Sequence, residues 1–513
     1  MRTSGNPERS QLVIPTCVVT MTTAHGENAC IKNASTLHQT FMKFLSHLLL
    51  LLAAAPLCPA QNISFTLATP QPALIEVYSG SSASGDIDGD GDNDLLLVGL
   101  DPGRQTALYL NDGFGGFTEM TTPFPDASSS VTRFVDLDGD GDLDLFFSGL
   151  GSGVQEFAHI YVNDGQGSFT LLPNPALPQF QGTGVAIGDV DGDGDPDLLL
   201  AVKDQNNTFV ADVFLNDGSA MFTAAGSTGF TPVEFGAVVF LDAEGDGDLD
   251  AIIAGTDQNG DPSTLLYLND GGGIFAPDTV NTFVPLNAND VDVADTDGDG
   301  DLDILMSGTT DPFAVRTILY LNNGDGLFTE LTATGLQDTF GGTNVTADLD
   351  NDGDQDLVII GSQMGGLPNI YNIVYENLGG NTFVPTDTVG GEYIAVCTAE
   401  DFTGDGLVDL VVQGFVDNTN VYWNNTVTTA VREREAGMLQ VYPSPSGGRF
   451  TIRWDASERV RALHVYSAQG RLVHTQRAGT GMSTTLDLDL PAGAYLVQLR
   501  TEDAVLTKTV VVE

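Results

Sequence analysis

Carboxylates at alternate positions of a short loop are the residues of this sequence best suited to chemistry. Residues 86–94 read Asp-Ile-Asp-Gly-Asp-Gly-Asp-Asn-Asp. Ca²⁺ takes roughly six to eight oxygen ligands at about 2.3–2.6 Å. Side chains at positions 1, 3, 5 and 9 and the backbone carbonyl of position 7 supply such oxygens, and Gly91 permits the sharp turn. The loop therefore predicts a calcium site formed by Asp86, Asp88, Asp90, the carbonyl of Asp92, and Asp94.

The acidic loop recurs along the chain. It begins at Asp86, Asp136, Asp189, Asp242, Asp295 and Asp348, with a weaker copy at Asp401, and successive copies start 50 or 53 residues apart. The predicted ligands of the later loops are Asp136, Asp138, Asp140, Asp142 and Asp144; Asp189, Asp191, Asp193, Asp195 and Asp197; Asp242, Glu244, Asp246, Asp248 and Asp250; Asp295, Asp297, Asp299, Asp301 and Asp303; Asp348, Asp350, Asp352, Asp354 and Asp356; and Asp401, Thr403, Asp405 and Asp409. We expect six to seven structural calcium ions.

Other interpretations of these loops fit less well. An EF-hand needs Glu at position 12, where the first two loops have Leu97 and Phe147. Metal-free acidic turns would leave five carboxylates within nine residues to repel one another. Magnesium demands near-octahedral geometry and keeps its waters. Glu244 is expected to perturb the fourth site and Asn351 to change the sixth only mildly, while the seventh is expected to be weaker or empty.

A second motif keeps step with the loops. Tyr109-Leu-Asn-Asp-Gly recurs at 267, and at 161, 214 and 320 with one residue changed to Val162, Phe214 and Asn323; degenerate copies follow at 375 and 422. Asn-Asp-Gly is a hairpin signal, because such turns need positive φ. In the second unit, strands are expected at 131–135, 143–148, 158–162 and 169–172. Four strands in each of seven units predict an all-β fold with a seven-bladed β-propeller over residues 61–425.

The ends of this region predict a closed ring. The last unit lacks a fourth strand, and residues 63–67 read like the missing copy, so the first strand should complete the last blade. The acidic loops and Asn-Asp-Gly turns should share one face. Variable loops on the opposite face are where an unknown protein or glycan ligand should bind, and they carry Arg104, Lys203 and Arg316. These cations would contact ligand or would simply aid solubility.

Charge is strongly negative and uneven. The chain carries a net charge of −52, and only four basic residues occur between 61 and 430. Such a surface repels nucleic acid, so no nucleic-acid partner is expected. Cys397 is the one cysteine downstream of residue 60. It is expected to be a buried, inert thiol.

The N-terminal segment indicates export. Residues 42–60 have a short positive region, an apolar core and a small final residue, as in a signal peptide cleaved after Ala60. Met42 is the expected start, which makes residues 1–41 an extension. A lipoprotein signal through Cys58 fits poorly, and the mature chain is expected to have no transmembrane segment.

The loops resemble FG-GAP/VCBS repeats, the propeller units also found in integrin α-subunits. The resemblance covers about residues 61–425. It implies structural metal loops on one face and partner binding on the other.

A linker at 426–437 precedes a different composition. Residues 438–513 alternate apolar strands with Gly turns, which predicts a small β-sandwich. This part resembles the C-terminal sorting domain of type IX secretion in Bacteroidota. The resemblance implies the type IX machinery as a partner and export through the outer membrane to the cell surface or medium.

The function expected is adhesion or glycan recognition by a non-enzymatic module. One alternative is a polysaccharide-active enzyme, and another is a purely structural envelope protein. A lyase is disfavoured by the few cations and by His159 being the one histidine of the propeller region. A hydrolase with two carboxylates stays open.

Overall fold

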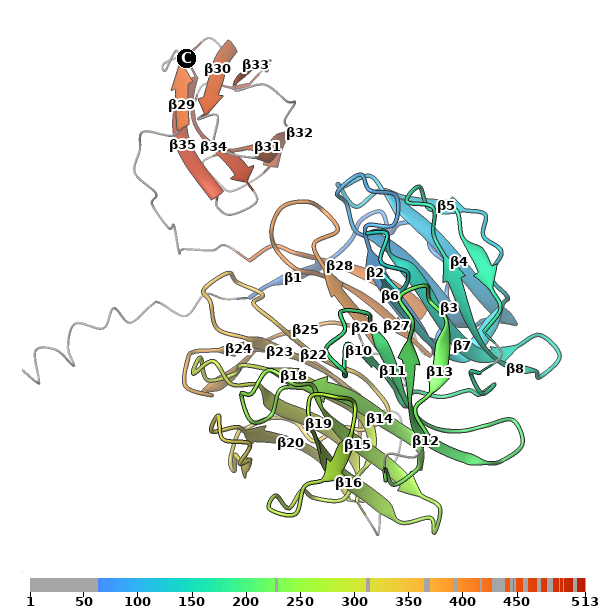
Figure 1. The fold of residues 1–513 in the computed structure, drawn as a ribbon. Helices are drawn as coiled ribbons and strands as arrows, with labels where there is room; N and C mark the ends of the chain where they lie inside the picture. The colour runs from blue at the N-terminus through green and yellow to red at the C-terminus, as the bar shows by residue number, and fades with distance from the viewer. Residues whose placement is uncertain are drawn as a thin grey trace, which may run out of the picture. The chain divides into compact units, whose positions relative to one another are not determined.

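Antiparallel strands make up the regular structure of the chain. The computed structural model describes residues 63–426, except 175, 227–228, 311–313, 364–369, 391–394 and 416–417, and residues 439–512, except 443–445, 447–448, 455–459, 468–471, 478–482, 489, 492 and 502–504. Every regular element in these ranges is a strand (Figure 1). The predicted all-β class is confirmed. The expected extension, the signal segment with Met42 and Cys58, and linker residues 427–437 lie outside the described ranges.

Residues 63–426 form seven four-stranded antiparallel sheets. They are β2–β5 (Tyr78–Gly85, Asp94–Leu100, Arg104–Asn111, Phe117–Met120), β6–β9 (Ala127–Val135, Asp144–Gly151, Glu156–Val162, Thr170–Leu172), β10–β13 (Val185–Gly188, Asp197–Lys203, Phe209–Asn216, Phe222–Ala224), β14–β17 (Val233–Leu241, Asp250–Asp257, Pro262–Asn269, Phe275–Pro277), β18–β21 (Asn287–Ala294, Asp303–Thr309, Val315–Leu321, Thr329–Glu330), β22–β25 (Asn344–Ala347, Asp356–Ser362, Ile370–Asn377, Phe383–Thr388) and β26–β28 with β1 (Val396–Glu400, Asp409–Gly414, Asn418–Asn424, Phe65–Leu67).

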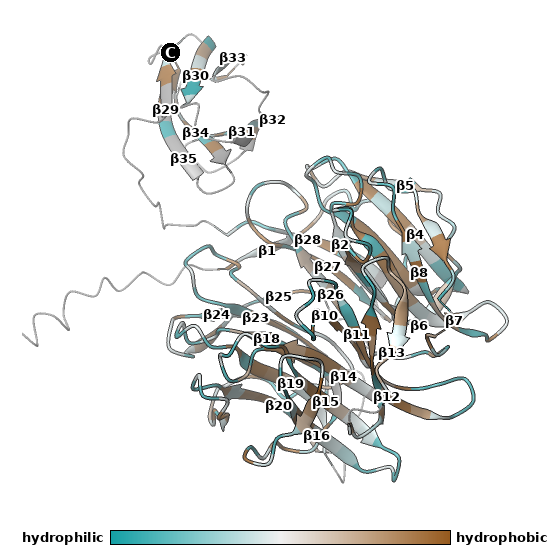
Figure 2. Ribbon diagram, in the orientation of Figure 1, coloured by the Kyte–Doolittle hydropathy of each residue, from teal (hydrophilic) through white to brown (hydrophobic). Residues whose placement is uncertain are grey.

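The second strand of each sheet is its buried centre. In β3 the first six residues are all buried. Burial on both faces explains why the sequence here is a continuous apolar run, whereas a half-exposed strand would alternate apolar and polar residues. Figure 2 shows apolar residues concentrated in the strands and polar residues in the connecting loops. The four strands predicted for the second unit are all present, with ends that differ by a few residues.

Each sheet packs on the next through apolar side chains. Leu96 and Leu145 lie in one cluster shared by the first two sheets, and the later sheets are joined in the same way. A further cluster holds Leu97 and Val411, which belong to the first and last sheets. The contacts therefore return to their start, and the fold is β-propeller-like.

Strand β1 completes the last sheet. It pairs antiparallel with β28, with Phe65 opposite Asn424 and Leu67 opposite Tyr422. Ile63 and Phe65 are 1% and 9% exposed. The predicted use of the first strand to complete the last unit is confirmed. Thr426, assigned to the linker from the sequence, is buried and bonds Asn424.

Residues 439–512 form two further sheets. One contains β29 (Leu439–Tyr442), β30 (Arg449–Trp454) and β33 (Ser483–Asp487), and the other β32 (Leu472–Arg477), β31 (Val460–Ser467), β34 (Gly493–Thr501) and β35 (Val505–Val512). One hydrophobic cluster includes buried side chains from both sheets, among them Phe450 and Val497.

Two smaller expectations concern export and redox chemistry. Among the described residues, no helix has the length and apolar character needed to cross a membrane. Cys397 is a buried free thiol, as predicted, and burial raises its pKa to about 12. The thiol therefore stays protonated, and unreactive, at neutral pH.

Candidate metal loops

Each acidic loop joins the first and second strands of its sheet, and its ninth residue begins the second strand. Asp94 is the first residue of β3, and Asp144 and Asp197 begin β7 and β11 in the same way. The ends of rigid strands therefore hold both ends of every loop. The side chains between them are fixed by the loop's own hydrogen bonds.

The carboxylate at position 1 organises the turn. Asp86 Oδ2 accepts a hydrogen bond from Gly91 N at 2.9 Å, and its Oδ1 accepts one from Asp90 N at 3.1 Å. Gly91 has φ of +92°, a conformation that favours glycine. At position 4, Asn351 has φ of +59°, where Gly89 has +74°. Asn tolerates this region better than other non-glycine residues, so the sixth loop keeps its path.

The carboxylate at position 9 is buried and links two motifs. Asp94 is 1% exposed, and it accepts hydrogen bonds from Ile87 N at 3.1 Å and from Asn111 N at 2.8 Å. Burial raises its pKa to about 7 in spite of these bonds. An ionised group here needs a nearby positive charge to offset the loss of water.

Carboxylate oxygens converge in five of the loops. In each of these, three acidic side chains offer oxygens that all lie within 4.8 Å of one another. The groups are Asp86, Asp88 and Asp90; Asp136, Asp138 and Asp144; Asp189, Asp191 and Asp197; Asp295, Asp297 and Asp299; and Asp348, Asp350 and Asp356. Asp138 Oδ1 and Asp297 Oδ1 are buried and have no hydrogen-bond partner among the described residues. Hard oxygens gathered in this way fit a calcium ion.

The fourth and seventh loops differ from these five. Within the described ranges, no such triplet occurs in the loops that contain Glu244 and Thr403. The seventh loop keeps the internal bonds of the others, since Asp401 Oδ2 accepts Gly406 N at 2.7 Å. Leu407 stands at its position 7 and is buried. The structure thus brings together three predicted ligands in each of five loops. These stand at positions 1, 3 and 5 in the first and fifth loops, and at positions 1, 3 and 9 in the second, third and sixth.

The acid at position 7 lies beside the hairpin turn of the same sheet. A Cβ atom on Gly113 would collide with the Asp92 carboxylate, and Gly165 stands in the same relation to Asp142. This contact places the acidic loop and the Asn-Asp-Gly turn at the same end of the sheet, as predicted. It also explains the glycine of the turn beyond its φ of +71°.

The asparagine of the second motif joins neighbouring sheets, a role that sequence reasoning missed. Asn216 Nδ2 donates to Leu137 O at 2.8 Å, and Leu137 is position 2 of the preceding acidic loop. The same bond recurs at 2.8–3.0 Å in all seven sheets, from Asn111, Asn163, Asn216, Asn269, Asn322, Asn377 and Asn424 to Phe402, Ile87, Leu137, Val190, Ala243, Thr296 and Leu349. The bond from Asn111 to Phe402 joins the first sheet to the last.

The sequence patterns also gave no indication of two acids on β18, Asp290 and Asp292, that bind the next sheet. Asp290 Oδ2 accepts Asn344 N at 2.5 Å, and Asp292 Oδ2 accepts Thr346 N at 2.9 Å. These bonds tie β18 to β22. Burial, followed by the charge of Asp292, raises the pKa of Asp290 to about 7. No local spacing distinguishes these acids from the many others in the chain.

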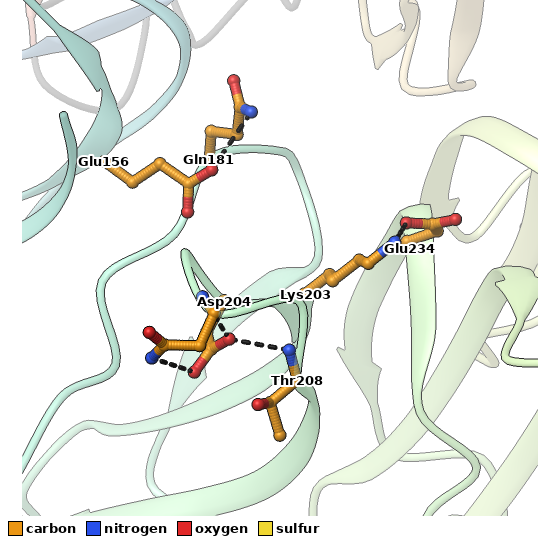
Figure 3. A network of polar contacts seen from close by, with 7 residues as sticks. Glu156, Gln181, Lys203, Asp204, Thr208 and Glu234 are labelled. Atoms are coloured by element: carbon orange, nitrogen blue, oxygen red, sulfur yellow. Dashed lines mark hydrogen bonds and ion pairs between the residues drawn. The ribbon is translucent and has the colours of Figure 1, made fainter. Parts of the chain in front are cut away.

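The cations of the opposite-face loops have partners within the chain. Lys203 Nζ lies 2.8 Å from Glu234, beside a loop that Asp204 fixes by accepting Thr208 N (Figure 3). Arg316 pairs with Glu330 at 3.0 Å, and Arg104 Nε donates to Ser128 Oγ at 3.1 Å. These bonds favour a structural role for the three cations over ligand contact.

Comparison with known families separates the chain into two parts. Residues 86–147, 136–200, 242–306 and 348–412 match a family described as FG-GAP-like repeat. Residues 440–513 match a family described as secretion system C-terminal sorting domain. No curated protein matches the chain. The sorting domain implies export to the cell surface or medium.

Several solved structures are weakly similar. PorZ, a surface component of the type IX secretion system of Porphyromonas gingivalis, is 14% identical, with a TM-score of 0.42 over 86% of this chain and 60% of PorZ. The BP39L lectin of Burkholderia pseudomallei is 12% identical, with a TM-score of 0.43 over 69% of this chain and 100% of the lectin. The V. cholerae biofilm matrix protein Bap1 is 17% identical, with a TM-score of 0.31 over 88% of this chain and 69% of Bap1. This chain therefore spans less than two thirds of PorZ.

Proposed function

We propose that this protein is a calcium-stabilised binding module that acts outside the cell. The proposal is consistent with its FG-GAP-like repeats and its secretion system C-terminal sorting domain. The seven sheets of residues 63–426 are the blades of one closed propeller. The two sheets of residues 439–512 are a small β-sandwich that directs export. Calcium is a ligand of folding in this proposal, and the chain is not an enzyme.

The repeated carboxylate triplets carry the calcium proposal. Three acidic oxygens lie within 4.8 Å of one another in the acidic loops of five sheets. Like charges this close repel unless a cation or protons neutralise them. A bound calcium ion would supply that charge and would bridge the start of the loop to the strand that follows it. The chain's own contribution is to hold the oxygens in place through the loop's backbone bonds.

Calcium should therefore stabilise the folded chain strongly. A ligand that binds only the native state adds about 2.7 kcal/mol for each site at a hundredfold excess over Kd. We would measure thermal unfolding of the mature chain with excess calcium and with chelator, together with metal content by mass spectrometry. A large stabilisation with five to seven ions per chain is expected. Equal melting temperatures and little bound metal would reject the calcium proposal.

An aromatic pair with one exposed ring, that of Phe415, supports binding at the opposite face. Phe415 follows β27 and is 51% exposed, and its ring contacts Tyr78 edge to face at 4.8 Å between centroids. Both residues lie at the strand ends remote from the acidic loops. Exposed aromatic rings are favoured contact groups in recognition surfaces. Because Arg104, Lys203 and Arg316 of the opposite-face loops have partners within the chain, we propose a ligand without strong negative charge, such as a neutral glycan or a protein.

Binding through this pair can be tested separately from calcium. We would screen the calcium-loaded chain against neutral and acidic glycans and against outer-surface proteins, with Phe415→Ala as the variant. Val154→Ala is a matched control, because Val154 is 70% exposed but belongs to another loop. Loss of binding in Phe415→Ala alone would support the proposal. Turnover of a polysaccharide would instead favour the enzyme alternative, and no ligand at all would favour a structural envelope protein.

A further inference from the structure

The sixth acidic loop lies in a more buried setting than the others. Asp350, at its third position, is 0% exposed. The equivalent third residues of the other loops are partly exposed to solvent. Asp352 at position 5 is also half-buried, where Asp90 and Asp140 are exposed. Carboxylates that have lost this much water depend more strongly on a bound cation.

One oxygen of Asp350 has no protein partner. Asp350 Oδ1 accepts Asp352 N at 3.2 Å, while Asp350 Oδ2 is buried without a hydrogen-bond partner among the described residues. Oxygens of Asp348, Asp350 and Asp356 lie within 4.8 Å of one another. A buried carboxylate oxygen left in this position is well placed to face a cation.

A glutamate from a neighbouring strand adds to this cluster. Glu376 lies in β24, directly before the asparagine that joins adjacent sheets, and it is 2% exposed. Five other sheets have an aliphatic residue there: Leu110, Val162, Leu215, Leu268 and Leu321. Leu357 lies opposite Tyr375 in the antiparallel pairing of β23 with β24, so the same register brings Glu376 beside Asp356. The next residue of β24, Asn377, donates its backbone N–H to Asp356 Oδ1 at 2.8 Å. The carboxylate of Glu376 is therefore a close neighbour of the sixth loop, because directly opposed residues of two strands share a face of the sheet.

We propose that Glu376 supplies an additional negative charge to the sixth metal loop, which makes this the tightest cation site of the chain. The inference rests on the proposed binding of calcium by the acidic loops. Calcium affinity rises with the number of carboxylates that a site offers and with its rigidity. The sixth loop has both, because strand β24 holds the extra acid and burial limits the movement of Asp350.

The test removes the charge in two ways. Glu376→Leu introduces the residue that four other sheets carry, and Glu376→Gln keeps the shape if the leucine variant does not fold. Calcium binding to the mature chain would be measured by titration in competition with a chelator. The tightest site is expected to weaken about tenfold or more, as for other groups that support a metal site. Leu215→Gln, at the same place in the third sheet, is the control and should leave this site unchanged.

Stability separates this role from simple packing. The rise in melting temperature that calcium produces should be smaller in both Glu376 variants than in the unaltered chain, because the sixth site has lost a charge. A role in packing alone would lower the melting temperature equally with calcium and with chelator. An equal loss in both states, or an unchanged tightest site, would overturn the inference while leaving calcium binding intact. An unaltered chain that binds no calcium would instead reject the proposed function.

Discussion

The asparagine before each hairpin turn is the residue with the most connections among the repeated positions. Asn216 N donates to Asp197 Oδ1 at 2.8 Å, and its side chain donates to Leu137 O at 2.8 Å and to Pro196 O at 3.1 Å. One side chain therefore holds its own acidic loop and the preceding one. A buried carbonyl that loses its donor costs about 1–3 kcal/mol.

We accordingly expect Asn216→Ala to destabilise the calcium-loaded chain by about 1–3 kcal/mol. Urea unfolding with excess calcium measures this. Asn206→Ala is the control, because Asn206 is exposed and bonds only within its own loop. Equal stability of the two variants would show that the bond between sheets contributes little.

The buried acids at position 9 give the metal-free chain an unusual pH dependence. Burial raises the pKa to about 6 for Asp144 and Asp197, and to about 8 for Asp356. The native state therefore binds more protons than the unfolded state between about pH 4 and pH 8, and its stability falls as pH rises through this window. With chelator, the melting temperature should be higher at pH 5 than at pH 8.

Excess calcium should reverse this trend, because protons compete with the cation for the same carboxylates. The melting temperature would then be higher at pH 8 than at pH 5. Melting curves at both pH values, with calcium and with chelator, check both halves of the prediction. A metal-free chain that gains stability on going from pH 5 to pH 8 would contradict it.

At the scale of strands, β1 closes the sheet that would otherwise have an open edge. Phe65 is 9% exposed within a cluster that also contains Tyr422 of β28. Phe65→Ala should cost about 3–5 kcal/mol, as for other buried phenylalanines. Leu67→Ala in the same strand is the control, since Leu67 is 49% exposed. Urea unfolding compares the two, and equal losses would mean that β1 contributes little to closure.

Much of this architecture could be predicted from the sequence, because the patterns that mark strands and turns are local. Apolar runs such as that of β7 mark buried strands, and the regular acidic loops mark the joins between them. The missing fourth strand of the last unit indicated that β1 would fill it. Contacts between sheets could not be predicted in this way, since Asn216 and Leu137 are 79 residues apart.

One signal for these contacts was nonetheless present. The aspartate of the turn is replaced by Leu378 after Asn377, and both the aspartate and the glycine are replaced after Asn424, yet the asparagine itself is present. An asparagine that is present where the turn sequence is absent indicates a function other than forming the turn. Glu376 was overlooked for a related reason, because a single acid among 70 carries no pattern until the pairing of β23 with β24 brings it beside Asp356.

For the molecule as a whole, folding and export are expected to reside in different parts. Deletion of residues 440–513 should leave the calcium-dependent melting of the repeat region in place and abolish transfer across the outer membrane of a host with type IX secretion. Cell fractionation and melting of the truncated chain measure the two effects. Continued export of the truncated chain would contradict the division.

The pairing of β1 with β28 has a consequence for how the chain could be cut and rejoined. Because Phe65 lies opposite Asn424, the first and last strands of the repeat region are adjacent in one sheet. A short bridge between these ends would let translation begin at a different sheet without breaking any native strand pair. The molecule should therefore tolerate circular permutation at the loops between sheets. The same ring of sheets should form whichever repeat is synthesised first.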